Sequence, residues 1–117
     1  MARIATLLAL DIALFAGASM VHGGLLPIGE LHSRAAIAEG IVAVALALGF
    51  VTALARPSLV RLTALAAQGL ALLGTLVGTV MIAIGIGPQT SGDKMFHAAL
   101  VVVLVSGLWL AAGIRQR

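Results

Sequence analysis

The sequence contains no cysteine, and aromatic side chains make up only 3% of its 117 residues. The absence of cysteine excludes disulfides, thiolate metal sites and thiol redox chemistry. The scarcity of aromatic residues leaves no base-stacking surface of the kind that single-stranded nucleic acids need. The net charge is only +3, and the seven basic residues are scattered instead of forming a basic stripe. We therefore expect no nucleic-acid partner.

Charge of either sign is also scarce. Charged residues account for 9% of the chain and hydrophobic residues for 62%, whereas a soluble domain has about 25% charged residues. A chain this short could not hide so much apolar surface in a core of its own. The composition predicts that the solvent of this protein is lipid.

Four apolar segments follow one another along the chain, at about residues 4–22, 31–55, 58–86 and 94–114. Each is long enough to cross the hydrocarbon layer of a membrane, which is about 30 Å thick. Hydrocarbon offers no partners to unpaired backbone groups, so such segments are helices. Because the loops are short, sequential helices should pack as antiparallel neighbours. The sequence predicts an all-α, single-domain bundle of four transmembrane helices.

The basic residues predict the orientation in the membrane. Two basic residues, Arg34 and Lys94, fall on one side of the four segments. The other five fall on the opposite side: Arg3, Arg56, Arg61, Arg115 and Arg117. By the positive-inside rule both termini are cytoplasmic, in an inner or plasma membrane. The loops at 23–30 and 87–93 then face outward.

All three histidines fall near that outward side. His22 closes the first segment, His32 opens the second, and His97 lies one turn into the fourth. Histidines on different helices at a similar depth could bind haem b axially. With a carboxylate or a methionine they could instead bind a transition metal such as zinc or copper. Met20, Met81 and Met95 share this half of the membrane and are candidates for a soft-metal site.

Three polar side chains are predicted to lie deep in the bilayer. Asp11 and Gln68 fall near the middle of their segments, and Glu39 lies about two turns below His32. A carboxyl group inside a membrane costs a few kcal/mol, so Asp11 and Glu39 are candidates for a functional role. Either carboxyl group could instead be protonated and hydrogen-bonded across helices to Gln68 or to a threonine.

Helical spacing assigns one carboxylate to each histidine. The three pairs that share a helix face are Asp93 with His97, His32 with Glu39, and Asp11 with His22. These carboxylates could orient the imidazoles or relay protons. The structural alternatives are that Glu30 and Arg34 form an ion pair at a helix start and that Asp93 caps the fourth helix.

These features favour a binding or electron-transfer protein with an outward-facing site for a metal ion or haem. One alternative is a proton-coupled small transporter that works as a homo-oligomer, joined through the Gly74/Gly78 GxxxG motif. Another is an accessory subunit of a larger membrane complex. The sequence contains no GxSxG, Walker or HExxH motif. It therefore does not favour an enzyme.

Overall fold

The computed structural model describes residues 2–114 and confirms an all-helical fold. The four long helices of the described chain are α1 (Ala2–His22), α2 (Ser33–Ala55), α3 (Val60–Ala83) and α4 (Ser91–Ala112). A single 3-10 turn, η1 (Pro57–Leu59), joins α2 to α3. All four helices are long and apolar enough to cross a membrane. The fold is thus compatible with a multi-pass membrane protein.

Two helix boundaries differ from the predicted ones by three residues, because of local backbone chemistry, and the others lie within two residues of the prediction. The third helix ends at Ala83 rather than at residue 86, since Gly85 and Gly87 take left-handed conformations with φ of 84° and 94°. The fourth helix begins at Ser91 rather than at residue 94. Thr90 and Asp93 form a capping box there, in which each side chain accepts a hydrogen bond from the other's backbone N–H. The predicted capping role of Asp93 is confirmed.

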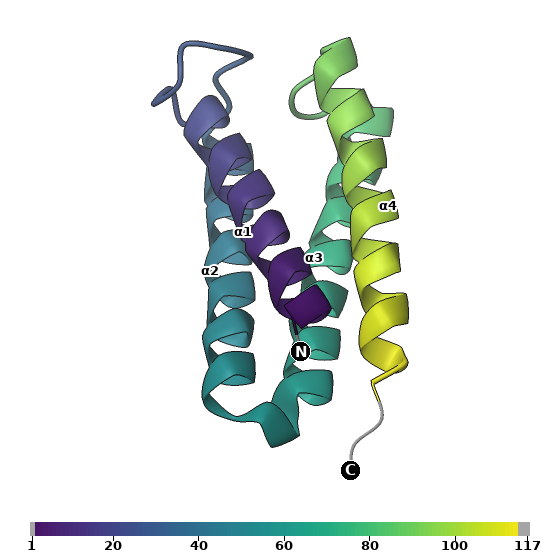
Figure 1. The fold of residues 1–117 in the computed structure, drawn as a ribbon. Helices are drawn as coiled ribbons and strands as arrows, with labels where there is room; N and C mark the ends of the chain where they lie inside the picture. Colours follow the sequence, from purple (N-terminus) through teal and green to yellow (C-terminus); the bar gives the residue numbers. More distant parts are fainter. Residues whose placement is uncertain (1, 115–117) are drawn as a thin grey trace.

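The helices form an antiparallel bundle in chain order (Figure 1). α1 packs against α2, α2 against α3, and α3 against α4, while α1 and α4 touch along a smaller surface. α1 begins and α4 ends near the α2–α3 connection. Residues 23–32 and 84–90 form the opposite end, which we call the polar end. The antiparallel order brings the C-terminus of α1 and the N-termini of α2 and α4 to the polar end.

Small residues bring the helices close together. An added Cβ at Gly49 of α2 would lie 2.7 Å from the Cβ of Ala67 on α3, so these helices touch almost backbone to backbone. Leu8, Leu46 and Leu104 fill the remaining interior and are fully buried. Large apolar side chains are instead exposed on the outer surface of all four helices, as suits lipid contact.

The GxxxG motif of α3 faces other helices of the same chain. An added Cβ at Gly74 would lie 3.4 Å from Cγ2 of Val42 on α2. One at Gly78 would lie 3.0 Å from Nε2 of His97 on α4. The close approach that the motif permits is therefore already used within one chain, and an oligomer contact through this pair stays a prediction.

Candidate functional site

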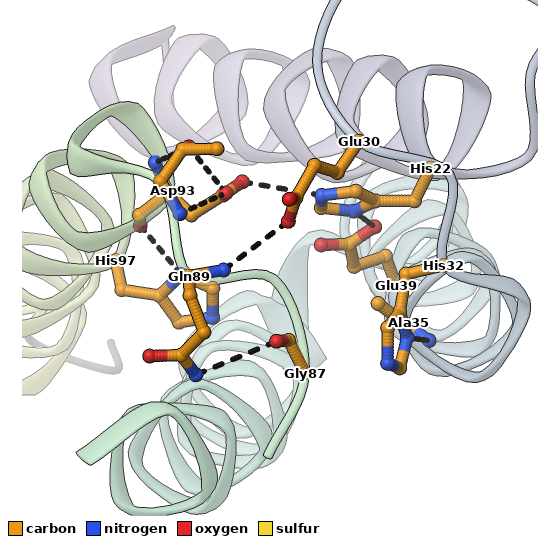
Figure 2. Close-up of polar contacts among 10 residues, drawn as sticks. His22, Glu30, His32, Ala35, Glu39, Gly87, Gln89, Asp93 and His97 are labelled. Carbon is orange, nitrogen blue, oxygen red and sulfur yellow. Dashed lines mark hydrogen bonds and ion pairs between the residues drawn. The ribbon is translucent and has the colours of Figure 1, made fainter. Parts of the chain in front are cut away.

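The imidazole of His22 is the point at which three helices meet at the polar end (Figure 2). His22 is the last residue of α1 and is only 4% exposed. Its Nδ1 lies 2.8 Å from Oε2 of Glu39 on α2, and its Nε2 lies 3.3 Å from Oδ1 of Asp93 on α4. We call His22, Glu39 and Asp93 the His22 cluster.

The contacts of the His22 cluster fix how many protons it holds. A carboxylate can only accept hydrogen bonds, so two contacts to one imidazole need two protons among the three groups. Either the ring carries both protons and lies between two carboxylates, or the ring and one carboxyl group carry one each. In both arrangements the charges sum to minus one. The cluster can therefore shift a proton between helices without changing its total charge.

Asp93 is held rigidly by the capping box of α4. Its Oδ2 accepts hydrogen bonds from the backbone N–H and the hydroxyl of Thr90, while Oδ1 is left to meet His22. Its backbone carbonyl accepts a hydrogen bond of 2.9 Å from Nδ1 of His97. The neutral His97 ring therefore has its lone pair on Nε2, beside Gly78.

His32 does not join the cluster. It is the N-cap of α2, and its Nδ1 accepts a hydrogen bond of 3.1 Å from the backbone N–H of Ala35. The neutral ring then carries its hydrogen on Nε2 and can donate from there. Since both nitrogens of His22 are also engaged, His97 alone of the three histidines keeps an open lone pair among the described contacts.

Nothing in this arrangement supports a metal or haem site. Within residues 2–114 no group of three or more His, Asp or Glu side chains is placed to hold a metal ion. Met20 and Met95 are exposed and are not among the residues that line the central cavity described below, whereas Met81 does line it. Metal and haem binding stay predictions from the sequence.

The pairings predicted from helical spacing differ from those in the structure. Glu39 of α2 and Asp93 of α4 both contact His22, which lies on α1. His97 meets the backbone carbonyl of Asp93 rather than its carboxylate. Asp11 meets Gln68 of α3 instead of His22. Spacing within one helix identifies residues that share a face, but it contains no information on which neighbouring helix that face meets.

The predicted ion pair between Glu30 and Arg34 is wrong. Oε2 of Glu30 accepts a hydrogen bond of 3.3 Å from the backbone N–H of Gln89, which ties the two loops of the polar end together (Figure 2). The side chain of Gln89, which sequence reasoning missed, donates to the carbonyl of Ile82. Across the described residues no carboxylate pairs with Arg34, which is exposed and lines the mouth of a cavity.

This central cavity has a volume of about 290 Å³ and is lined by residues of all four helices. Its polar lining comes mainly from His22, His32, Arg34, Glu39 and His97. Deeper in the bundle the lining is mostly apolar, with Phe15, Val42 and Leu100 beside the hydroxyl-bearing Thr75. Apolar residues such as Ile86 and Pro88 also line the cavity at the polar end. Gly74 and Gly78 also line it, and their missing side chains leave the space open. Sequence reasoning missed Phe15 and Arg34 and gave the two glycines a different role, although the GxxxG motif was a usable signal for open space.

A second hollow lies on the other side of His22. This lateral groove of about 350 Å³ runs between α1, α4 and the loop after α1. Its lining is apolar, for example Gly17, Val21 and Phe96, except for His22 and Asp93. His22 thus separates the central cavity from the lateral groove.

Asp11 and Gln68 form a separate buried pair closer to the other end of the bundle. Nε2 of Gln68 donates a hydrogen bond of 2.7 Å to Oδ2 of Asp11, and both side chains are fully buried. Neither residue lines the central cavity or the lateral groove. Asp11 and Glu39, the two carboxyl groups predicted to lie deep in the bilayer, therefore belong to different sites.

The function of this protein has to be inferred from the geometry of the polar end. No family model, curated protein or solved structure matches this chain. The polar end offers a proton-sharing cluster, an open imidazole lone pair on His97 and the exposed guanidinium of Arg34, at one end of a cavity with a mostly apolar deeper part. That combination suits binding a molecule with a polar head and an apolar body.

Proposed function

We propose that this protein binds a small amphipathic molecule in the central cavity between its four helices. The proposal places the protein in an inner or plasma membrane, with both termini in the cytoplasm and the polar end facing outward. The observation that carries the proposal is that the ionisable side chains of the cavity lining gather at the polar end, while the buried apolar side chains of Phe15 and Leu100 line its deeper part. Its volume of about 290 Å³ is near the lower end of small-molecule sites, roughly 300–1,000 Å³.

The polar lining favours a head that carries oxygen atoms. The guanidinium of Arg34 has no carboxylate partner in the described chain and can donate to an acceptor. Nε2 of His32 can donate as well, because Nδ1 is engaged in capping α2. Nε2 of His97 can accept a hydroxyl proton. A carboxylate or a carbonyl oxygen would accept hydrogen bonds from Arg34 and His32, and a hydroxyl group on the same head would donate to His97.

The apolar lining favours a hydrocarbon body. Phe15 and Leu100 are buried, and they present carbon surface to the cavity below the histidines. An apolar ligand segment placed there is removed from water, but the gain over lipid is small, so shape and the polar head must supply the selectivity. We therefore expect short-chain ligands to be preferred over full-length lipids.

Photolabelling in vesicles tests the proposal. The purified protein is reconstituted in phosphatidylcholine and irradiated with a diazirine-bearing decanoic acid, and the labelled peptides are mapped by mass spectrometry. Gly74→Leu places a side chain in the cavity. Gly69→Leu on the same helix is the matched control, because Gly69 faces open space and does not line the cavity.

We expect labelling of cavity-lining segments in the wild type and in Gly69→Leu. That labelling should be lost in Gly74→Leu and competed away by unlabelled decanoate. Labelling spread evenly over the lipid-facing surface, or unchanged in Gly74→Leu, would contradict the proposal. Parallel probes with an alcohol or an amine head identify the preferred head group.

A second function is favoured by one further observation. His22 shares protons with carboxylates of two other helices and lines both the central cavity and the lateral groove. We propose that ligand binding is coupled to proton exchange at this ring. In vesicles containing a pH-sensitive dye, decanoate should move protons faster with wild-type protein than with His22→Gln. Equal rates of proton movement for the two proteins, each verified as folded, would contradict this coupling.

A further inference from the structure

The side chains of Asp11 and Gln68 leave two polar atoms without partners. Both residues are fully buried, and one hydrogen bond, from Nε2 of Gln68 to Oδ2 of Asp11, joins them. Oδ1 of Asp11 and Oε1 of Gln68 have no hydrogen-bond partner. Buried polar atoms are nearly always hydrogen-bonded, so two such atoms on one pair of contacting residues call for an explanation.

A missing proton accounts for both atoms at once. Oδ1 of an ionised aspartate and Oε1 of an amide are both acceptors, so they cannot satisfy each other. If Oδ1 carries a hydrogen, the carboxylic acid becomes a donor that can bind Oε1. The acid and the amide then form a closed pair with two hydrogen bonds, one in each direction.

We propose that Asp11 is a buried proton-binding site, in which the neutral acid donates from Oδ1 to Oε1 of Gln68. The proton is taken up from water and released to water, and no other atom changes partner. This site is distinct from the proposed ligand cavity, since neither residue lines it. The proton on Asp11 makes the buried pair electrically neutral within the apolar interior of the bundle.

Within the described chain no positively charged side chain contacts Asp11 to neutralise an ionised carboxylate. The titratable groups on the other helices are engaged elsewhere, Glu39 and Asp93 with His22, and His97 with a backbone carbonyl. His22 itself lies eleven residues along α1, about 16 Å at 1.5 Å per residue. A metal cation would need several more oxygen ligands than these two.

Gly107 of α4 holds the amide in place. An added Cβ at Gly107 would lie 2.6 Å from each of Cδ, Nε2 and Oε1 of Gln68. The amide plane therefore lies flat against the backbone of Gly107, and no other residue type leaves room for it. Gly107 is a positioning residue for this pair.

Isotope-edited infrared spectroscopy tests the proton site directly. Asp11 and Asp93 are the only aspartates in the sequence, so ¹³C-labelled aspartate marks two carboxyl groups, and the Asp93→Asn variant leaves one. We expect this variant, in lipid vesicles at neutral pH, to show the C=O stretch of a protonated carboxylic acid that shifts with the label. An isotope-sensitive carboxylate band without an acid band would overturn the proposal.

Two further variants test the hydrogen bonding. Gln68→Leu removes the amide donor, so the acid band should move to higher wavenumber. Gly107→Ala should move it in the same direction, because the methyl group displaces the amide. Gly69→Ala, at a glycine with open space around it, is the control and should leave the band unchanged. If the wavenumber of the acid band is unchanged in both Gln68→Leu and Gly107→Ala, the proton is not shared with Gln68.

Discussion

Nδ1 of His22 lies 2.8 Å from Oε2 of Glu39, and this contact joins the end of α1 to the second turn of α2 within the buried part of the bundle. Seventeen residues separate the two in sequence. The contact leaves Nε2 of His22 free to meet Asp93, so it is the first link of a chain that reaches α4. Four predictions follow from the geometry around it.

The contact between His22 and Glu39 should be measurable as a coupling free energy. Hydrogen bonds between membrane helices contribute about 0.6 kcal/mol on average and up to about 1.7. We expect a value in the upper part of this range, because the bond joins ionisable groups at a buried position. A double-mutant cycle of His22→Ala and Glu39→Ala, followed by reversible unfolding in mixed micelles, gives the number. Strictly additive effects would contradict a direct interaction.

The capping box of α4 should support the cluster from outside it. Thr90→Ala removes the acceptor for the backbone N–H of Asp93, and loss of an N-cap costs about 1 kcal/mol. It also frees the Asp93 carboxylate to rotate away from His22. We expect both lower stability and a changed imidazole signal of His22 in NMR spectra. Ser91→Ala, at the next position, is the control; if it had the same effect on His22, the capping box would not be the cause.

We expect that haem b is not bound by this protein through two axial histidines. Both nitrogens of His22 are hydrogen-bonded to carboxylates, and Nδ1 of His32 accepts the hydrogen bond that caps α2. Neither ring therefore offers a lone pair to iron unless one of these hydrogen bonds breaks. We expect a titration with haem b to produce no low-spin absorption spectrum. A low-spin spectrum that disappears in His97→Gln would restore the haem hypothesis.

Arg34 should select for an anionic head in the central cavity. Hydrogen bonds to charged groups contribute about 1.5–3 kcal/mol, so Arg34→Gln should weaken binding of decanoate about tenfold or more. Binding of decanol should change much less. Lys94→Gln is the matched control, because Lys94 is a basic residue at the same end of the bundle that does not line this cavity. Equal losses for decanoate and decanol, or for both variants, would argue against a role of Arg34 in binding the head.

The residues near Asp93 show how far local sequence reasoning reaches. The position of Asp93 at the start of the fourth apolar segment was enough to predict that it caps α4, because capping involves only residues within one turn, although the N-cap residue itself is Thr90. The ion pair of Glu30 with Arg34 was predicted from similar spacing and is wrong. Glu30 lies before the start of α2, where helical spacing does not apply, and its carboxylate reaches Gln89 of the other loop.

The four apolar helices and their antiparallel order could be predicted from the residues alone, since hydrocarbon length, backbone hydrogen bonding and short loops leave few alternatives. The sequence also indicated that His22, His32 and His97 lie near one end. The packing of the helices was needed to show that His22 bridges two carboxylates and that His32 is used in capping, and to choose Gln68 over His22 as the partner of Asp11. Those pairings depend on how each helix is rotated about its axis. That rotation is set by close packing of small residues such as Gly49 and Gly107 against neighbouring helices, which no periodicity within a single helix encodes.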